Sequence, residues 1–156
     1  MSTRERLRNK KVSKKEIPGG NQMKVGLPRA LLYYWFGPAW KVFLSELGQE
    51  TITSPPTNKA ILDNGVKAMV DEACLPVKIF LGHALFLAGR CEGILLPQIV
   101  SVEKNEYICP KFMGLVDMTR QTIKESPLFI WRSDRGSPWD TLSSLPKEMS
   151  FLAGRN

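Results

Sequence analysis

The sequence predicts an α/β fold: a partial doubly wound (Rossmann-like) domain with a mainly parallel sheet of about four strands and helices on both faces. The main observation is that short, apolar, β-prone segments alternate with segments whose apolar residues recur at helical spacing. Glycine and proline separate many of these segments, as is usual at element boundaries. The alternation continues to Trp131, and Ser, Pro, Gly and scattered charges follow it.

The expected strands are short, apolar or β-branched, and bounded by turn-forming residues: 24–27, 50–53, 93–96 and 128–131. Pro97 is expected to close the third of them, because proline cannot donate to a ladder of strand hydrogen bonds. Residues 99–102 are expected to extend an edge of the sheet, and 103–111 to form a polar loop.

The expected helices carry apolar stripes at 29–36, 40–47, 61–69, 77–88 and 113–123. Gly37 and Pro38 are expected to separate the first two, with Pro38 at a first helical position. Thr57 is the expected N-cap of the third helix. The fourth has the most regular apolar face, and Gly89 is placed to end it.

By composition the chain divides into a basic leader (1–22), an α/β domain (23–131) and an irregular tail (132–156). The leader, which we expect to be disordered, holds seven Lys or Arg and two Glu, and so contributes most of the net charge of +7. Such a leader can bind nucleic acid or anionic lipid. It lacks aromatic residues for base stacking and a strong amphipathic face, so nucleic acid is the last-ranked partner.

Several classes of protein are disfavoured. No segment reaches the roughly 18 consecutive apolar residues of a membrane span. Three cysteines are an odd number in a chain of this length, which argues against a disulfide scaffold and indicates reduced thiols in the cytoplasm. The sequence contains no Gly-x-Gly-x-x-Gly and no Walker A motif, which argues against a nicotinamide-dependent dehydrogenase and against an ATPase.

Cys74 and Cys109 are the candidate ligands. Cys74 lies two residues before Pro76 at the start of the 77–88 helix, and Cys109 directly precedes Pro110. Backbone N–H groups at a helix start favour a thiolate and can donate to the sulfurs of a cluster. The two positions are far apart in sequence and belong to no Cys-x-x-Cys motif, so two inert buried thiols remain the alternative. Cys91 fits no metal-ligand spacing and is interpreted as structural.

His83 is the single histidine. Because no serine or cysteine partner is visible in the sequence, it is expected on a helix surface or between helices. No Gly-x-Ser-x-Gly motif occurs either, so a hydrolase is disfavoured.

A set of ordered motifs runs along the chain: Met23–Trp35 (MKVGLPRALLYYW), Ser54–Lys59 (SPPTNK), Asp71–Lys78 (DEACLPVK), Val100–Lys104 (VSVEK) and Tyr107–Lys111 (YICPK). Over about residues 23–125 the chain resembles the N-terminal part of the acyl-CoA dehydratase activase-related proteins. These proteins are similar to 2-hydroxyacyl-CoA dehydratase subunits and to double-cubane cluster proteins.

The resemblance implies an iron–sulfur cluster of the 4Fe-4S kind, held by cysteines between two Rossmann-like domains and supplied with an electron by an ATP-hydrolysing activase. It maps Cys74 and Cys109 onto ligand positions, with the remaining ligand coming from a second domain. Lys78 and Lys111 lie near these cysteines and would support the negative charge of thiolates or cluster, or attract a CoA phosphate.

The expected function is therefore an iron–sulfur-binding electron-transfer module of an acyl-CoA dehydratase/activase-type system, not catalytic by itself. Its expected partners are an activase ATPase, acyl-CoA, and a second domain or second copy that shares the cluster. The alternative is a cluster-free α/β interaction module, or a truncated remnant of the family.

Overall fold

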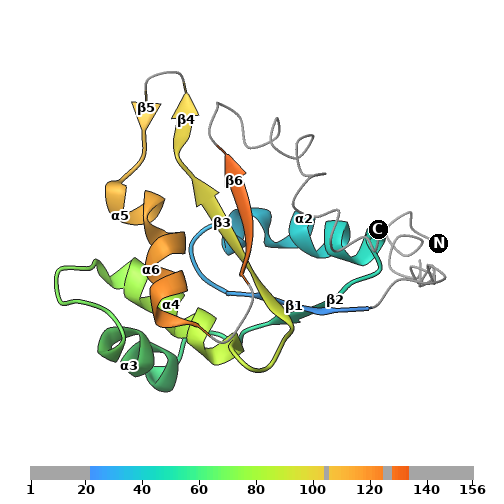
Figure 1. The fold of residues 1–156 in the computed structure, drawn as a ribbon, viewed down its shortest axis with the longest axis horizontal. Helices are drawn as coiled ribbons and strands as arrows, with labels where there is room; N and C mark the ends of the chain where they lie inside the picture. Colours follow the sequence, from blue (N-terminus) through green and yellow to red (C-terminus); the bar gives the residue numbers. More distant parts are fainter. Residues whose placement is uncertain (1–21, 104–105, 125–127, 134–156) are drawn as a thin grey trace, which may run out of the picture.

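The computed structural model describes residues 22–103, 106–124 and 128–133. Its centre is a parallel sheet in the order β2-β1-β3-β6 (Figure 1). The strands are β1 (Lys24–Leu27), β2 (Glu50–Thr53), β3 (Gly93–Ile99) and β6 (Leu128–Ser133). This confirms the predicted partial doubly wound α/β fold.

The helices are α2 (Tyr33–Glu46), α3 (Lys59–Lys67), α4 (Leu75–Leu87), α5 (Pro110–Met113) and α6 (Leu115–Thr122). Helix α2 packs on one face of the sheet, where Trp40 and Leu44 meet Leu95. Helices α4 and α6 pack on the other face, where they meet Ile94 and Leu96. Adjacent residues of β3 thus point into different cores, as strand geometry requires.

Helix α2 differs from the expectation of two helices separated at Gly37 and Pro38. It is continuous, with Pro38 inside it and exposed to solvent. An internal proline costs a helix about 3 kcal/mol through a lost hydrogen bond and a steric clash. Burial of Trp40 and Leu44, which follow Pro38 in the same helix, offsets this cost, because each large buried apolar side chain contributes about 2 kcal/mol.

Strand β3 continues through Pro97 to Ile99, so the expected closure at Pro97 was wrong. Beyond Ile94, β3 pairs with β6 alone, because the pairing with β1 ends there. A proline is tolerated where one side of a strand has no partner. Strand β6 likewise runs two residues past Trp131, to Ser133. The leader up to residue 21 and the tail beyond Ser133 lie outside the described residues.

After β3 the chain forms an antiparallel hairpin of β4 (Ser101–Glu103) and β5 (Glu106–Tyr107), where an edge extension and a polar loop were expected. The helix expected at 113–123 is two helices, α5 and α6, that meet at Gly114. The residue before α5 is Cys109, so this hairpin and this helix together place the second candidate ligand.

Helices α3 and α4 approach so closely that glycine is required on both. A Cβ atom added at Gly65 would lie 1.9 Å from the Lys78 carbonyl oxygen, and one at Gly82 would lie 2.1 Å from the Ile61 carbonyl oxygen. Backbone atoms cannot move aside as a flexible side chain can. This contact sets the distance between α3 and α4, and with it the path of the 68–74 loop to Cys74.

We predict that Gly65→Ala and Gly82→Ala each lower the free energy of unfolding by about 2–3 kcal/mol, because the new methyl group pushes two helix backbones apart. Urea unfolding followed by circular dichroism measures the change. Gly114→Ala is the matched control, since its Cβ would have ordinary contact at 3.4 Å. Equal stability of all three variants would contradict the close contact.

Candidate functional site

The two candidate ligands occupy equivalent local positions. Cys74 is the N-cap of α4 and Cys109 the N-cap of α5, and each helix has a proline in its first turn. Both thiols are free and exposed, so the alternative of two buried, inert thiols is wrong. Each cysteine therefore directly precedes the first turn of a helix, which has 13 residues after Cys74 and four residues after Cys109.

A lysine joins the two cysteine loops. The Lys111 ammonium group, two residues after Cys109, donates a hydrogen bond to the carbonyl oxygen of Glu72, two residues before Cys74. Lys78, on α4, donates to the carbonyl oxygen of Asp71 over 3.1 Å. Both lysines that the sequence singled out therefore bind the backbone of one loop. Sequence spacing could not show this proximity, because the two loops belong to different helix starts.

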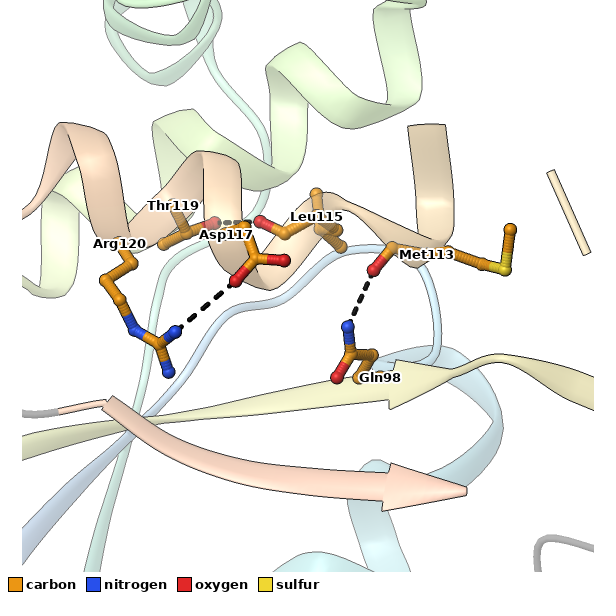
Figure 2. A network of polar contacts seen from close by, with 6 residues as sticks. All are labelled: Gln98, Met113, Leu115, Asp117, Thr119 and Arg120. Carbon is orange, nitrogen blue, oxygen red and sulfur yellow. Dashed lines mark hydrogen bonds and ion pairs between the residues drawn. The ribbon is translucent and has the colours of Figure 1, made fainter. Parts of the chain in front are cut away.

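Helix α5, which follows Cys109, is also hydrogen-bonded to strand β3 (Figure 2). Gln98 on β3 donates from its side-chain amide to the Met113 carbonyl oxygen at the end of α5, over 2.7 Å. On α6, Thr119 donates to the Leu115 carbonyl oxygen over 2.7 Å, and Arg120 pairs with Asp117 at 3.3 Å. The direct link from β3 to α5 holds the helix that begins after Cys109.

Among the described residues, the candidate metal ligands are the two cysteines Cys74 and Cys109. Across residues 22–103, 106–124 and 128–133, no three or more His, Cys, Asp or Glu residues are grouped so as to hold a metal ion. Cys91 lies away from the pair, between α4 and β3. Its half-buried thiol donates to the Leu87 carbonyl oxygen over 3.3 Å, and burial raises its pKa. Cys91 has the environment of a packed thiol.

His83 is fully buried, which excludes a helix-surface position, one of the two that the sequence left open. Its Nδ1 atom lies 2.8 Å from the Ser54 hydroxyl, and its Nε2 atom lies 3.0 Å from the Thr57 hydroxyl. Ser54 also accepts a hydrogen bond of 2.8 Å from the backbone N–H of Arg29. The serine partner that the sequence did not reveal is therefore Ser54, in the segment SPPTNK that the resemblance had already marked.

This network holds segments of the fold together. Ser54 is 1% exposed and His83 is 0% exposed, so both side chains are enclosed by the protein. The network joins α4 to the residues that directly follow β1 and β2. Thr57 was the expected N-cap of α3, but its hydroxyl bonds to the His83 ring instead. Asn58 has that role, its side-chain oxygen accepting from the Ile61 N–H over 3.0 Å.

Taken together, the parallel sheet and the joined cysteine loops define a Rossmann-like α/β domain with two exposed thiols at adjacent helix starts. The chain belongs to the family described as the CoA enzyme activase uncharacterised domain, which matches residues 24–144. The match covers most of the chain and continues beyond Ser133. No curated protein and no solved structure gives a significant match. No helix among the described residues is long and apolar enough to cross a membrane.

We predict that His83 makes stability depend on pH. Burial, and next the charge of Arg29, lower its pKa in the folded protein, whereas an unfolded histidine titrates at about 6.5. The unfolded state therefore binds more protons as pH falls, and stability decreases below pH of about 6.5. The measurement is urea unfolding between pH 5 and 8. His83→Asn should weaken the decrease of stability with falling pH. Thr57→Val should destabilise the protein at every pH but leave that pH dependence unchanged. Identical slopes in wild type and His83→Asn would show that His83 is not the cause.

We also predict that Cys74 and Cys109 can be cross-linked within one chain. In a Cys91→Ala background, a short bis-maleimide should join them, because Lys111 holds their loops together. Lys111→Met should reduce the yield several-fold, and Lys59→Met, which alters an exposed lysine paired with Asp63, should not. Peptide mass spectrometry identifies the product. Exclusively intermolecular cross-links would show that the two thiols are not neighbours in one chain.

Proposed function

We propose that the chain is an iron–sulfur-binding electron-transfer module related to 2-hydroxyacyl-CoA dehydratases and their activases. The observation that carries the proposal is a pair of exposed cysteines, Cys74 and Cys109, at two helix starts whose loops are joined by Lys111. Membership of the CoA enzyme activase uncharacterised domain family supports a role in a CoA-dependent system.

The described residues supply some, but not all, of the ligands that an iron–sulfur cluster requires. Clusters of this kind are held by thiolates, commonly four, and are tuned by N–H donors and nearby charge. Cys74 and Cys109 offer two thiols, each at the N-terminus of a helix. Lys78 and Lys111 add positive charge beside them. The described residues thus provide half of a four-cysteine set, and the remaining ligands would come from another domain or a second chain.

A bound cluster would supply one-electron transfer at low potential. The residues of this chain position the two thiols at the protein surface, where a partner can reach them. Lys111 keeps the Cys109 loop against Glu72, and Gln98 keeps α5 against β3. The exposed thiols leave room for a second set of ligands, and for docking of an ATP-hydrolysing activase. Acyl-CoA is the substrate class that the resemblance to the acyl-CoA dehydratase systems suggests for the assembled system, and the family description names a CoA enzyme.

The second candidate is a cluster-free interaction module of the same family. It is favoured by the absence of a third grouped metal ligand in the described ranges. It is also favoured by Tyr34, Trp35 and Val42 on α2, which are large, apolar and between 64% and 82% exposed. Exposed apolar side chains gathered on one helix are typical of a surface that binds another protein.

We predict that protein purified without oxygen, or reconstituted with iron and sulfide, binds both and absorbs visible light near 400 nm. Cys74→Ala and Cys109→Ala should each remove most of the bound iron and sulfide, because each thiolate is a direct ligand. Cys91→Ala is the matched control and should keep wild-type iron content. Iron and acid-labile sulfide per chain, measured with the mass of the assembly by light scattering, reveal whether two chains share one cluster.

Two outcomes would overturn the proposal. Wild-type protein that stays free of iron and sulfide after reconstitution, alone and with its activase present, would leave the interaction module as the function. Iron that persists equally in all three cysteine variants would show adventitious binding and remove Cys74 and Cys109 from the ligand set. Thermal unfolding of each variant establishes that the loss of iron does not follow from loss of the fold.

A further inference from the structure

A second group of polar side chains lies at the carboxyl ends of β1 and β2. The last residues of these strands, Leu27 and Thr53, are register partners. The next segments are held together as well: Ser54 donates its N–H to the Leu27 carbonyl oxygen over 3.2 Å, and Arg29 donates its N–H to the Ser54 hydroxyl. The Arg29 side chain therefore begins at this edge. In open α/β sheets, ligands bind outside the carboxyl ends of the strands, and the ends of β1 and β2 form part of that edge.

Two cations, Lys41 and Arg29, act on the Tyr33 side chain. The Lys41 ammonium lies 5.3 Å from the centre of the Tyr33 ring. Burial, the largest effect, acts to raise the pKa of Tyr33, but hydrogen bonding to Lys41 and Thr53 and the charges of Lys41 and Arg29 outweigh it, so that the pKa is lowered. Neither Arg29 nor Lys41 belongs to an ion pair among the residues that the structure describes, where the pairs are Lys59–Asp63 and Arg120–Asp117.

The backbone beside Arg29 adds hydrogen-bond donors. Leu31 has a φ of +51°, in the left-handed region, and Leu32 follows with φ −63° and ψ −14°. Successive residues of opposite hand turn their N–H groups toward a common point and form anion-binding concavities. No backbone acceptor within the described ranges takes the N–H of Leu31 or Leu32. A left-handed leucine is also strained, and such strain is concentrated at ligand sites.

We propose that Arg29, Lys41 and Tyr33, with the backbone N–H groups of Leu31 and Leu32, bind the phosphate group of a small phosphate ester. Arginine presents a planar fork that matches two phosphate oxygens, lysine adds a point charge, and the tyrosine hydroxyl donates a further hydrogen bond. Two cations and several donors suit a doubly charged, tetrahedral anion better than a carboxylate, which offers one charge. The site is independent of Cys74 and Cys109.

The buried histidine network has a defined part in this site. Ser54 fixes the backbone of Arg29, the His83 ring bonds to Ser54 through Nδ1, and Thr57 holds the ring through Nε2. Arg29 is close enough to His83 for its charge to lower the pKa of the ring. Ser54 is therefore a positioning residue: it does not touch the anion, but it determines where the guanidinium group begins.

The test is calorimetric titration of the full-length protein with inorganic phosphate, pyrophosphate and acetate at constant chloride. Saturable binding of phosphate or pyrophosphate, with acetate at least tenfold weaker, is expected. Preference for pyrophosphate over inorganic phosphate would indicate a diphosphate-bearing ligand, and the reverse a phosphate monoester. Arg29→Gln and Lys41→Gln should each weaken binding about tenfold or more, since each removes a charge-assisted hydrogen bond to the anion. Tyr33→Phe should weaken it less.

Lys59→Gln and Arg120→Gln are the matched controls and should leave the affinity unchanged, since both residues lie on other helices. Equal weakening in the controls would mean that net charge, and not this site, attracts the anion. Absence of saturable binding in the folded wild type would overturn the proposal. Unchanged binding in folded Arg29→Gln and Lys41→Gln would overturn it as well. Circular dichroism melting of every variant separates these results from unfolding.

Discussion

The hydrogen bonds of the buried His83 ring determine how α4 lies against the sheet. A neutral imidazole has one donor and one acceptor, and the hydroxyls of Ser54 and Thr57 satisfy both. Unpaired, each buried polar group would cost about 1–3 kcal/mol, so α4 cannot shift along its axis without loss. The position of α4 sets Cys74 at its N-terminus, and the same Ser54 hydroxyl holds the backbone of Arg29. Both candidate sites thus depend on one ring.

The two candidate sites lie at different distances from the main sheet. Cys74 lies nine residues before His83, which along an α-helix corresponds to roughly 14 Å. The first half of α4 therefore projects past the carboxyl ends of β1 and β2. Strand β3 is longer than β1 and provides support there, because Leu96 and Leu115 pack against Phe80 in one core cluster. The exposed thiols at the start of α4 and α5 can then bind an electron carrier. The cationic group of Arg29 and Lys41, nearer the sheet, can bind an anionic ligand separately.

Local pattern predicted those parts of the fold that depend on neighbouring residues. The four strands of the main sheet, the helical face of 77–88 and the placement of Cys74 and Cys109 at helix starts all follow from apolar spacing and from prolines near the first turn. The errors occurred where distant contacts outweighed a local signal. Burial of Trp40 and Leu44 kept α2 intact through Pro38, and the absence of a β1 neighbour allowed β3 to continue through Pro97.

By itself the sequence determined the α/β class, the family resemblance and the two cysteines worth testing, because periodicity and short motifs are properties of consecutive residues. Only the tertiary structure decided that Lys111 reaches Glu72, that His83 is buried against Ser54, and that the Lys41 ammonium lies over the Tyr33 ring. The first two of these contacts join residues that lie far apart in the chain or on separate elements. Strand order and helix packing bring them together, and no spacing within the sequence encodes that distance.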